Sequence, residues 1–220
     1  MGSDPPCTII RVSISMHFDQ QFKKIADIDV SELKSLVNTL TQEQWDQHSL
    51  RQEIFDVHSH TETIPLIFDQ DFRHRFQTVQ PAFTLFEQSL QPIMSAIKKY
   101  FLTHTPTTKG DRPNRVEKGY FVRIILVKLS AKGEINPHKD HGYSLSRAHR
   151  LHLPIITNDK VEFTIDGVTK NLAEGELYEI NNRGLHSVKN LSNSARVHLI
   201  LDFVIPDEII EDPINGTLYA

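Results

Sequence analysis

The chain has 220 residues, of which 39% are hydrophobic and 24% are charged, and its formal net charge is −4. This length and composition predict a soluble globular protein of one domain, or of one domain with a helical extension, and they exclude both a membrane span and a nucleic-acid-binding surface. The single cysteine excludes an internal disulfide, and together with a first segment that lacks a secretory signal it favours a reducing, cytoplasmic location.

The first 118 residues are predicted to be mostly helix and loop. A helix is expected to begin at Asp29 or Ser31, and Thr41 with Gln44 forms a capping-box pattern at the start of a second, short helix. The segment 58–66 is polar and then apolar, and we expect a surface loop there, with a lid over the site as the alternative.

The clearest predicted helix spans residues 82–102. Its apolar side chains recur at helical spacing and form one stripe, which indicates packing against a core. Pro92 interrupts the stripe, so we expect either a kink or two abutting helices.

Beyond residue 118 the pattern changes to short runs of β-branched, aliphatic and aromatic residues. The predicted strands are 120–129, 150–156, 161–165, 176–180, 186–189 and 196–204. Strands of this regular spacing are typical of an all-β sandwich or barrel, and Asp166-Gly167 predicts a hairpin turn. We therefore expect a lead-in (1–118) that packs on a β core (119–206), followed by a C-terminal tail (207–220).

Two histidines and an aspartate in the core have the spacing of a metal site. His138 and Asp140 are two residues apart, which places them on one face of a strand, and His186 lies on a later predicted strand. Two histidines and one carboxylate form the facial triad of non-haem Fe(II) oxygenases, which leaves coordination positions open. Taken singly, each residue is better explained as an ordinary polar residue of a hairpin. His141 is an alternative ligand, which we place at the rim.

An arginine follows the last of these histidines. Arg196 lies ten residues beyond His186, and if Val188 pairs with His198, Arg196 is about 13 Å along its strand from the position opposite His186. A guanidinium fork grips a carboxylate through two hydrogen bonds, so this spacing leaves room for a small dicarboxylate between the metal and the arginine.

The predicted strand at 150–156 has one polar and one apolar face. Arg150 and His152 alternate with Leu151 and Leu153, so the arginine and histidine point one way and the leucines the other. This pattern indicates a polar barrel interior. His152 fits a co-substrate contact and a hydrogen-bonded core histidine equally well.

These segments together resemble the aspartyl/asparaginyl β-hydroxylase family, a branch of the 2-oxoglutarate-dependent Fe(II) dioxygenases that includes bacterial free-proline hydroxylases. The matching motifs, in order, are His-x-Asp at 138–140, RLHLPI at 150–155, GELY at 175–178, HSV-x-N at 186–190 and RVHLILD at 196–202. The resemblance covers about residues 118–206, and the first 118 residues match only loosely.

The resemblance implies a mainly β protein with a helical N-terminal part and a double-stranded β-helix (jelly-roll, cupin-like) core. It implies an Fe(II) site made of His138, Asp140 and His186, with no catalytic residue beyond these ligands. It also implies a 2-oxoglutarate site made of Arg196, Arg150 and His152. O2 is the remaining co-substrate that the resemblance implies.

The implied activity is hydroxylation of an unactivated C–H bond, with succinate and CO2 as co-products. The animal aspartyl hydroxylase has glycine at the position of the carboxylate ligand, whereas this chain has Asp140. The chain therefore looks more like the bacterial branch, whose partner is a free amino acid or similar small molecule rather than nucleic acid or membrane. Two alternatives stay open, which are a hydroxylase of a protein side chain (Asp/Asn type) and a cupin-like metal-binding protein without oxygenase chemistry.

Three further residues are candidates for substrate contacts. Phe121, Arg123 and the alternate residues up to Leu129 share one strand face, and if that face lines the barrel, Arg123 is a buried cation that needs an anion. A substrate carboxylate and a salt bridge to Asp or Glu are both consistent with this. Tyr178 and Asn182 lie near the sites in sequence, and we expect them either to contact substrate or to shape the turn.

Overall fold

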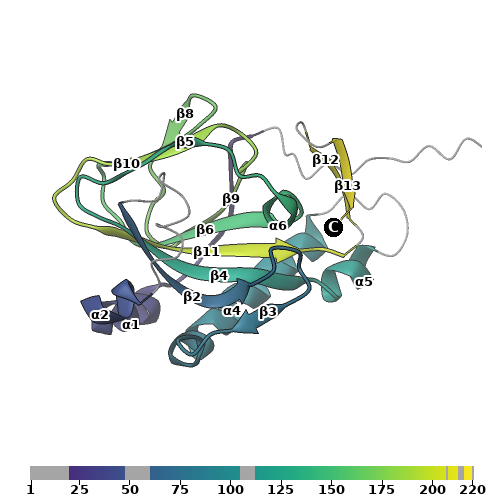
Figure 1. The fold of residues 1–220 in the computed structure, drawn as a ribbon, viewed down its shortest axis with the longest axis horizontal. Coiled ribbons are helices and arrows are strands. Elements are labelled where there is room, and N and C mark those ends of the chain that lie inside the picture. Colours follow the sequence, from purple (N-terminus) through teal and green to yellow (C-terminus); the bar gives the residue numbers. More distant parts are fainter. Residues whose placement is uncertain (1–19, 48–59, 105–111, 207, 213–215, 220) are drawn as a thin grey trace, which may run out of the picture.

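The computed structural model describes residues 20–47, 60–104, 112–206, 208–212 and 216–219. Two antiparallel sheets face each other, and helices lie against the outer face of the larger sheet (Figure 1). Among the described residues no helix combines the length and apolarity that crossing a membrane requires.

The larger sheet has seven strands. In spatial order they are β1 (Phe22–Asp27), β9 (Glu176–Ile180), β6 (His149–Ile156), β11 (Arg196–Val204), β4 (Tyr120–Leu129), β2 (Thr61–Asp69) and β3 (Gln77–Val79). The central strand β11 is buried along its whole length because one face meets the helices and the other faces the smaller sheet.

The smaller sheet has four strands. In spatial order they are β5 (Glu134–His138), β10 (His186–Asn190), β7 (Val161–Ile165) and β8 (Val168–Lys170). Consecutive strands such as β10 and β11 lie in opposite sheets, which is the arrangement of a double-stranded β-helix, so the predicted fold class is confirmed. Asp166 and Gly167 have φ values of 46° and 81° and form the predicted hairpin turn, which joins β7 to β8.

One long helix covers the outer face of the large sheet. Helix α4 (Phe83–Thr103) buries the predicted stripe, including Phe86, Leu90 and Ile97, against apolar side chains of β6, β4 and β11. It runs through Pro92 as one element, so the two abutting helices considered above do not occur. Pro92 is exposed, which leaves the buried stripe intact.

Four short helices complete the described part of the chain. They are α1 (Ser31–Thr39), α2 (Gln42–Asp46), α5 (Arg112–Glu117) and α6 (Tyr143–Ser146). The capping box predicted at Thr41 and Gln44 is present at the start of α2. At α1 the N-cap is Val30, while the side chain of Asp29 accepts a hydrogen bond from the backbone N–H of Ser31 at 2.9 Å.

The lead-in is not made of helix and loop alone, as the sequence analysis expected. It contributes β1, β2 and β3 to the large sheet, where β1 pairs with β9 and β2 pairs with β4. Part of the segment 58–66, expected to be a surface loop or lid, is the start of β2, and its residues 58 and 59 lie outside the described residues. The lead-in and the core therefore share one sheet.

Two expectations about strand faces were wrong. The strands β10 and β11 do not pair, because β10 lies between β5 and β7 whereas β11 lies between β4 and β6. Phe121 does not share the face of Arg123, because the register between β4 and β11 shifts between Phe121 and Arg123. This irregularity turns Phe121 toward Phe203 and the helical side.

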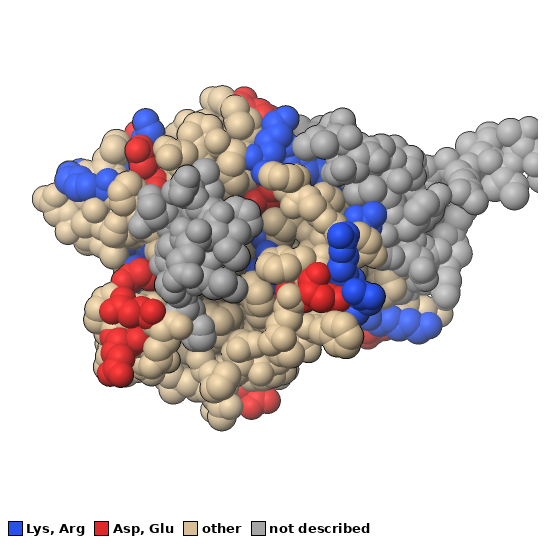
Figure 2. Space-filling model, in the orientation of Figure 1, with Lys and Arg blue, Asp and Glu red and all other residues tan. Residues whose placement is uncertain are grey.

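The terminal segment forms a separate hairpin of β12 (Ile209–Asp212) and β13 (Gly216–Tyr219). The face shown in Figure 2 carries both acidic and basic side chains, with acidic ones gathered at the lower left and basic ones at the right.

Candidate metal centre

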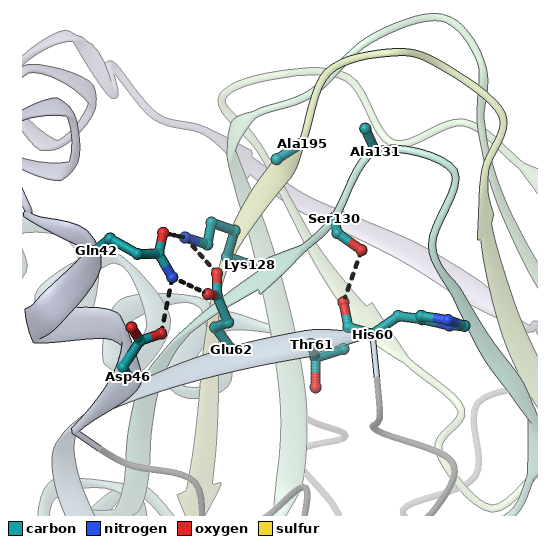
Figure 3. A pocket seen from close by; sticks show the side chains of 9 residues that line it. All are labelled: Gln42, Asp46, His60, Thr61, Glu62, Lys128, Ser130, Ala131 and Ala195. Atoms are coloured by element: carbon teal, nitrogen blue, oxygen red, sulfur yellow. Dashed lines mark hydrogen bonds and ion pairs between the residues drawn. The ribbon is translucent and has the colours of Figure 1, made fainter.

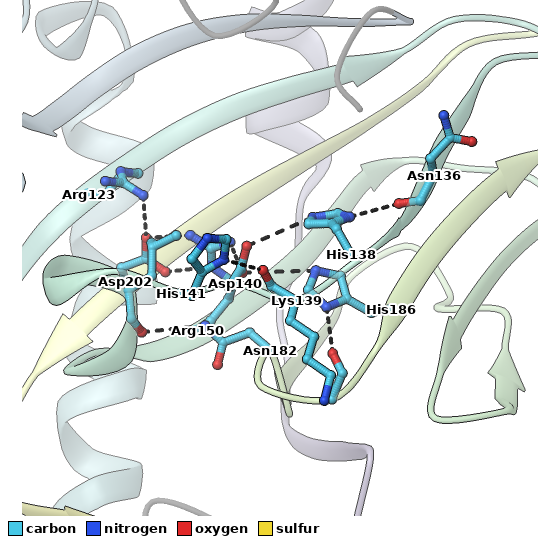
Figure 4. A network of polar contacts seen from close by, with 12 residues as sticks. Arg123, Asn136, His138, Lys139, Asp140, His141, Arg150, Asn182, His186 and Asp202 are labelled. Atoms are coloured by element: carbon cyan, nitrogen blue, oxygen red, sulfur yellow. Dashed lines mark hydrogen bonds and ion pairs between the residues drawn. The ribbon is translucent and has the colours of Figure 1, made fainter. Parts of the chain in front are cut away.

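Three side chains converge at one end of the small sheet. His138 is the last residue of β5, Asp140 follows it, and His186 begins β10 directly opposite His138. One ligand atom from each of the three lies within 4.8 Å of the others (Figure 4). The strand pairing therefore brings together residues that are 48 positions apart in the sequence.

Backbone carbonyls fix the orientation of both histidine rings. Nδ1 of His138 donates to the carbonyl of Asn136 at 2.8 Å, and Nδ1 of His186 donates to the carbonyl of Gly184 at 3.0 Å. Each Nε2 is then the unprotonated nitrogen, and each lies 3.9 Å from an oxygen of Asp140. Burial lowers the pKa of His186, which favours the neutral ligand form.

This donor set fits a divalent transition metal. Two imidazole nitrogens and one carboxylate oxygen on one side of the ion match the facial triad of non-haem iron, which keeps positions open for a chelating co-substrate and oxygen. His141 is exposed and lies outside the cluster, as expected for a rim residue.

A buried ion-pair network orients the carboxylate ligand. Arg150 donates through Nη1 to Asp140. It also donates to Asp202, through Nε at 2.8 Å and through Nη2 at 2.9 Å. The backbone N–H of Asp140 also donates to the carbonyl of Asn182 at 3.1 Å. The sequence placed Arg150 beside the co-substrate, and the structure places it between two aspartates.

The interior beyond the triad carries a second polar group of residues. Arg196 and His198 of β11 face the interior with His152 of β6, and His198 Nδ1 lies 3.5 Å from His152 Nδ1. Phe163 lies beside both His152 and His186, with ring centroids 5.3 and 6.3 Å away, so this group is continuous with the triad.

The electrostatics of this second group suit a dicarboxylate. Arg196 is only 1% exposed. Burial, followed by the charges of Arg150 and Arg196, holds the pKa of His152 well below its usual range, and burial and Arg196 do the same to the pKa of His198. His198 Nε2 is buried and has no hydrogen-bond partner among the described residues. A buried cation beside neutral imidazoles therefore fits the distal carboxylate of 2-oxoglutarate.

The three substrate candidates have different surroundings. The hydroxyl of Tyr178 donates a hydrogen bond to Glu176 at 2.9 Å, and Glu176 also accepts one from Lys24. The hydroxyl is therefore bonded to a residue outside the triad. Burial and Glu176 raise the pKa of Tyr178 to about 12. Asn182 is buried beside Asp140, and Arg123 is buried with Nη1 3.4 Å from Asp202.

Asp202 is the residue that sequence reasoning missed. It is fully buried and lies within hydrogen-bonding distance of both Arg150 and Arg123. The sequence pattern could have identified it. Arg196, His198 and Asp202 are separated by even numbers of residues and so share one strand face, which is the argument that identified Arg150 and His152.

The mouth of the barrel has an aromatic and cationic rim. The guanidinium groups of Arg147 and Arg73 lie 3.8 and 5.2 Å from the ring of Tyr143 in α6. Nε2 of His74 lies 3.0 Å from the carbonyl of Ser144. The β2–β3 loop of the lead-in therefore packs on the segment that follows the metal ligands.

A separate surface pocket of about 590 Å³ lies between α2 and the ends of β2 and β4 (Figure 3). Gln42 bonds to Asp46, Glu62 and Lys128, and Lys128 also pairs with Glu62. These polar groups satisfy one another, and none of them belongs to the triad.

Comparisons with known proteins agree with this geometry. The family model described as Aspartyl/Asparaginyl beta-hydroxylase matches residues 20–206. No curated protein sequence matches the chain.

Two solved structures are similar in fold. An oxidoreductase of the 2OG-Fe(II) oxygenase family from Burkholderia pseudomallei has a TM-score of 0.56 at 12% identity, over 80% of this chain and 77% of that one. The non-heme monooxygenase ThoJ, in a nickel complex, has a TM-score of 0.50 at 12% identity, over 84% of this chain and 74% of that one. At these identities the likeness establishes the fold alone.

Proposed function

The chain belongs to the aspartyl/asparaginyl β-hydroxylase family, and from that premise we propose that it hydroxylates an unactivated C–H bond of a free amino acid or similar small molecule. As a member of this family it is a dioxygenase whose cofactors are Fe(II), 2-oxoglutarate and O2. We propose succinate and CO2 as the co-products and a reducing cytoplasm as the location.

In this proposal His138, Asp140 and His186 hold the metal, and the convergence of their ligand atoms within 4.8 Å is the observation that carries it. The bound iron, with 2-oxoglutarate and O2, supplies the oxidising power for oxygen insertion. Arg150 orients Asp140, and Arg196 binds the distal carboxylate of 2-oxoglutarate. His152 and His198 line the co-substrate between these two ends.

The preference for a small substrate rests on the contact between the lead-in and α6, the helix that follows Asp140. The β2–β3 loop contacts α6 through His74, whose ring centroid lies 5.5 Å from that of Tyr143, and through Arg73. A loop of the lead-in that packs here narrows the approach to the triad, which suits a small molecule better than a folded protein. Burial of the site also excludes water from a strongly oxidising reaction.

The test is an amino-acid and peptide panel supplied with Fe(II), 2-oxoglutarate and O2. We expect substrate-dependent succinate release and a product mass gain of ~16 Da, as oxygen insertion requires. The variants His138→Ala and His186→Ala should lose this turnover, whereas His141→Ala, from the same segment, should retain it.

Three outcomes would change the proposal. Full turnover by either ligand variant with a verified substrate would contradict the metal site. Turnover of peptides in preference to free amino acids would favour the protein side-chain alternative. Metal binding without any 2-oxoglutarate binding would revive the cupin-like alternative, which the family match disfavours.

A further inference from the structure

Arg123 is a buried cation on the interior face of β4. It is 6% exposed, and its guanidinium carbon lies 5.2 and 5.8 Å from the ring centroids of Phe68 and Phe72. Within the described part of the chain its polar contact is from Nη1 to an oxygen of Asp202 at 3.4 Å, which is long for an ion pair between buried groups. Phe72 is 44% exposed and belongs to the β2–β3 loop.

One edge of the Arg123 guanidinium has no acceptor among the described residues. Nε and Nη2 are buried and have no hydrogen-bond partner in the described part of the chain. These two nitrogens point the same way and form the fork that binds a carboxylate with two parallel hydrogen bonds.

Arg150 shows how this fork is used in the same cluster. Its Nε and Nη2 donate to the two oxygens of Asp202 at 2.8 and 2.9 Å. Both oxygens of Asp202 are therefore hydrogen-bonded to Arg150, and the contact of Asp202 with Arg123 is longer and weaker. Buried guanidinium N–H groups without acceptors are costly, and burial lowers the pKa of Arg123 in spite of the nearby Asp202. An anion from outside this cluster would offset that cost.

We propose that the fork of Arg123 binds a carboxylate of the substrate. This inference rests on the proposed function and names the substrate class as carboxylate-bearing. Figure 4 shows Arg123 at one end of a row of polar side chains that continues through Asp202 and Arg150 to Asp140. Phe68 and Phe72 provide apolar walls beside the fork, so the substrate is held by its carboxylate while another part of it faces the metal.

The kinetic test compares each panel compound that stimulates succinate release with its carboxamide. Arg123→Met should lower kcat/KM for the carboxylate about 10–100-fold, the range expected for a charge-assisted pair. The carboxamide should be a poor substrate for both proteins. Arg75→Met, which removes a surface arginine paired with Asp71, is the matched control.

A binding test is independent of turnover. In protein loaded with Zn(II) and 2-oxoglutarate, the ¹⁵N signal of the Arg123 Nε–H, assigned by its loss in Arg123→Lys, should shift saturably with acetate or a panel amino acid. It should not shift with acetamide.

The inference is overturned if no carboxylate shifts this signal up to its solubility limit, or if Arg123→Met keeps the wild-type kcat/KM for a carboxylate substrate. Either result leaves the proposed function intact as long as wild-type protein turns over 2-oxoglutarate. Absence of any metal-dependent 2-oxoglutarate binding would instead refute the proposed function. Amino acids blocked at one or the other carboxylate then distinguish an α-carboxylate from a side-chain carboxylate.

Discussion

At the scale of single residues, the site depends on how each polar side chain is held. The Nδ1 atoms of His138 and His186 are hydrogen-bonded to backbone carbonyls. Each ring is therefore already in the tautomer that leaves Nε2 available to a metal. Asp140 is held from one side by Arg150 and through its backbone by Asn182. The donor atoms are therefore arranged before any ion arrives, which lowers the ordering cost of binding.

The role of Arg196 can be separated from that of the metal ligands. We expect Arg196→Lys to raise the Kd for 2-oxoglutarate about 10–100-fold, because lysine keeps the charge and loses the planar fork. The affinity for Fe(II) should stay the same. The measurement is a titration of the absorption band of the anaerobic Fe(II)–2-oxoglutarate complex, with Arg75→Lys as control. An unchanged 2-oxoglutarate titration would exclude Arg196 from the co-substrate site.

Asp202 is expected to stabilise the fold as well as the site. Asp202→Asn removes the anion that Arg150 and Arg123 share and leaves buried positive charge uncompensated, which should lower the free energy of unfolding by about 3–5 kcal/mol. Urea denaturation measures this, and Glu174→Gln, which breaks the surface pair with Lys34, should cost less than about 1 kcal/mol. Equal effects of the two variants would contradict the network.

At the scale of elements, the lead-in completes the large sheet. Strand β2 covers one edge of β4, β1 covers one edge of β9, and α4 covers the apolar face formed by β6, β4 and β11. A fragment of residues 119–206 would expose these edges and this face. We expect it to lack a cooperative unfolding transition by circular dichroism and to regain one when residues 1–118 are co-expressed. A cooperatively folded, monomeric fragment would show that the core is an independent domain.

The strands of the lead-in were hidden from sequence reasoning for physical reasons. Strand β1 (FKKIAD) is short, polar and at the sheet edge, so it lacks a continuous apolar run. Strand β2 contains Pro65, which argues against a strand inside a sheet, and the structure accommodates it beside a register shift between Pro65 and Ile67. Six later strands, β4, β6, β7, β9, β10 and β11, were predicted because short apolar runs separated by turn residues mark them. The short strands β5 and β8 were missed because they lack such a run, and the hairpin of β12 and β13 lies in the segment that was expected to be a tail.

At the scale of the whole molecule, the convergence of the three candidate ligands was predictable and their surroundings were not. His138, Asp140 and His186 could be selected because their order and the flanking motifs are specific. The pairing of β10 was predicted wrongly, because a sequence does not state which of two facing sheets a strand joins. The partners of Arg150 and Arg123 depend on side chains from three adjacent strands, β6, β11 and β4, and on the register between them.

One buried ion-pair cluster outside the site links segments that are far apart in the sequence. His149 of β6 donates from Nδ1 to Glu179 of β9 at 2.7 Å and from Nε2 to Glu208, beyond β11, at 2.8 Å. Its ring lies 4.3 Å from that of Phe101 in α4. Burial alone would lower the pKa of His149, but the carboxylates of Glu208 and Glu179 outweigh it and raise the pKa to about 9.

This cluster predicts how stability depends on pH. Because the pKa of His149 is about 6.5 in the unfolded chain and about 9 in the folded one, its stabilisation is complete below pH 6.5 and is lost as the pH rises through about 9. The loss should be on the order of 3 kcal/mol, measured as the free energy of urea unfolding across this window. In Glu208→Gln the pKa of His149 falls, so the loss should occur at lower pH, whereas Glu174→Gln, which removes a surface partner of Lys34, should leave the profile unchanged. A wild-type unfolding free energy that is constant from pH 6.5 to about 9 would mean that His149 is neutral in the folded protein.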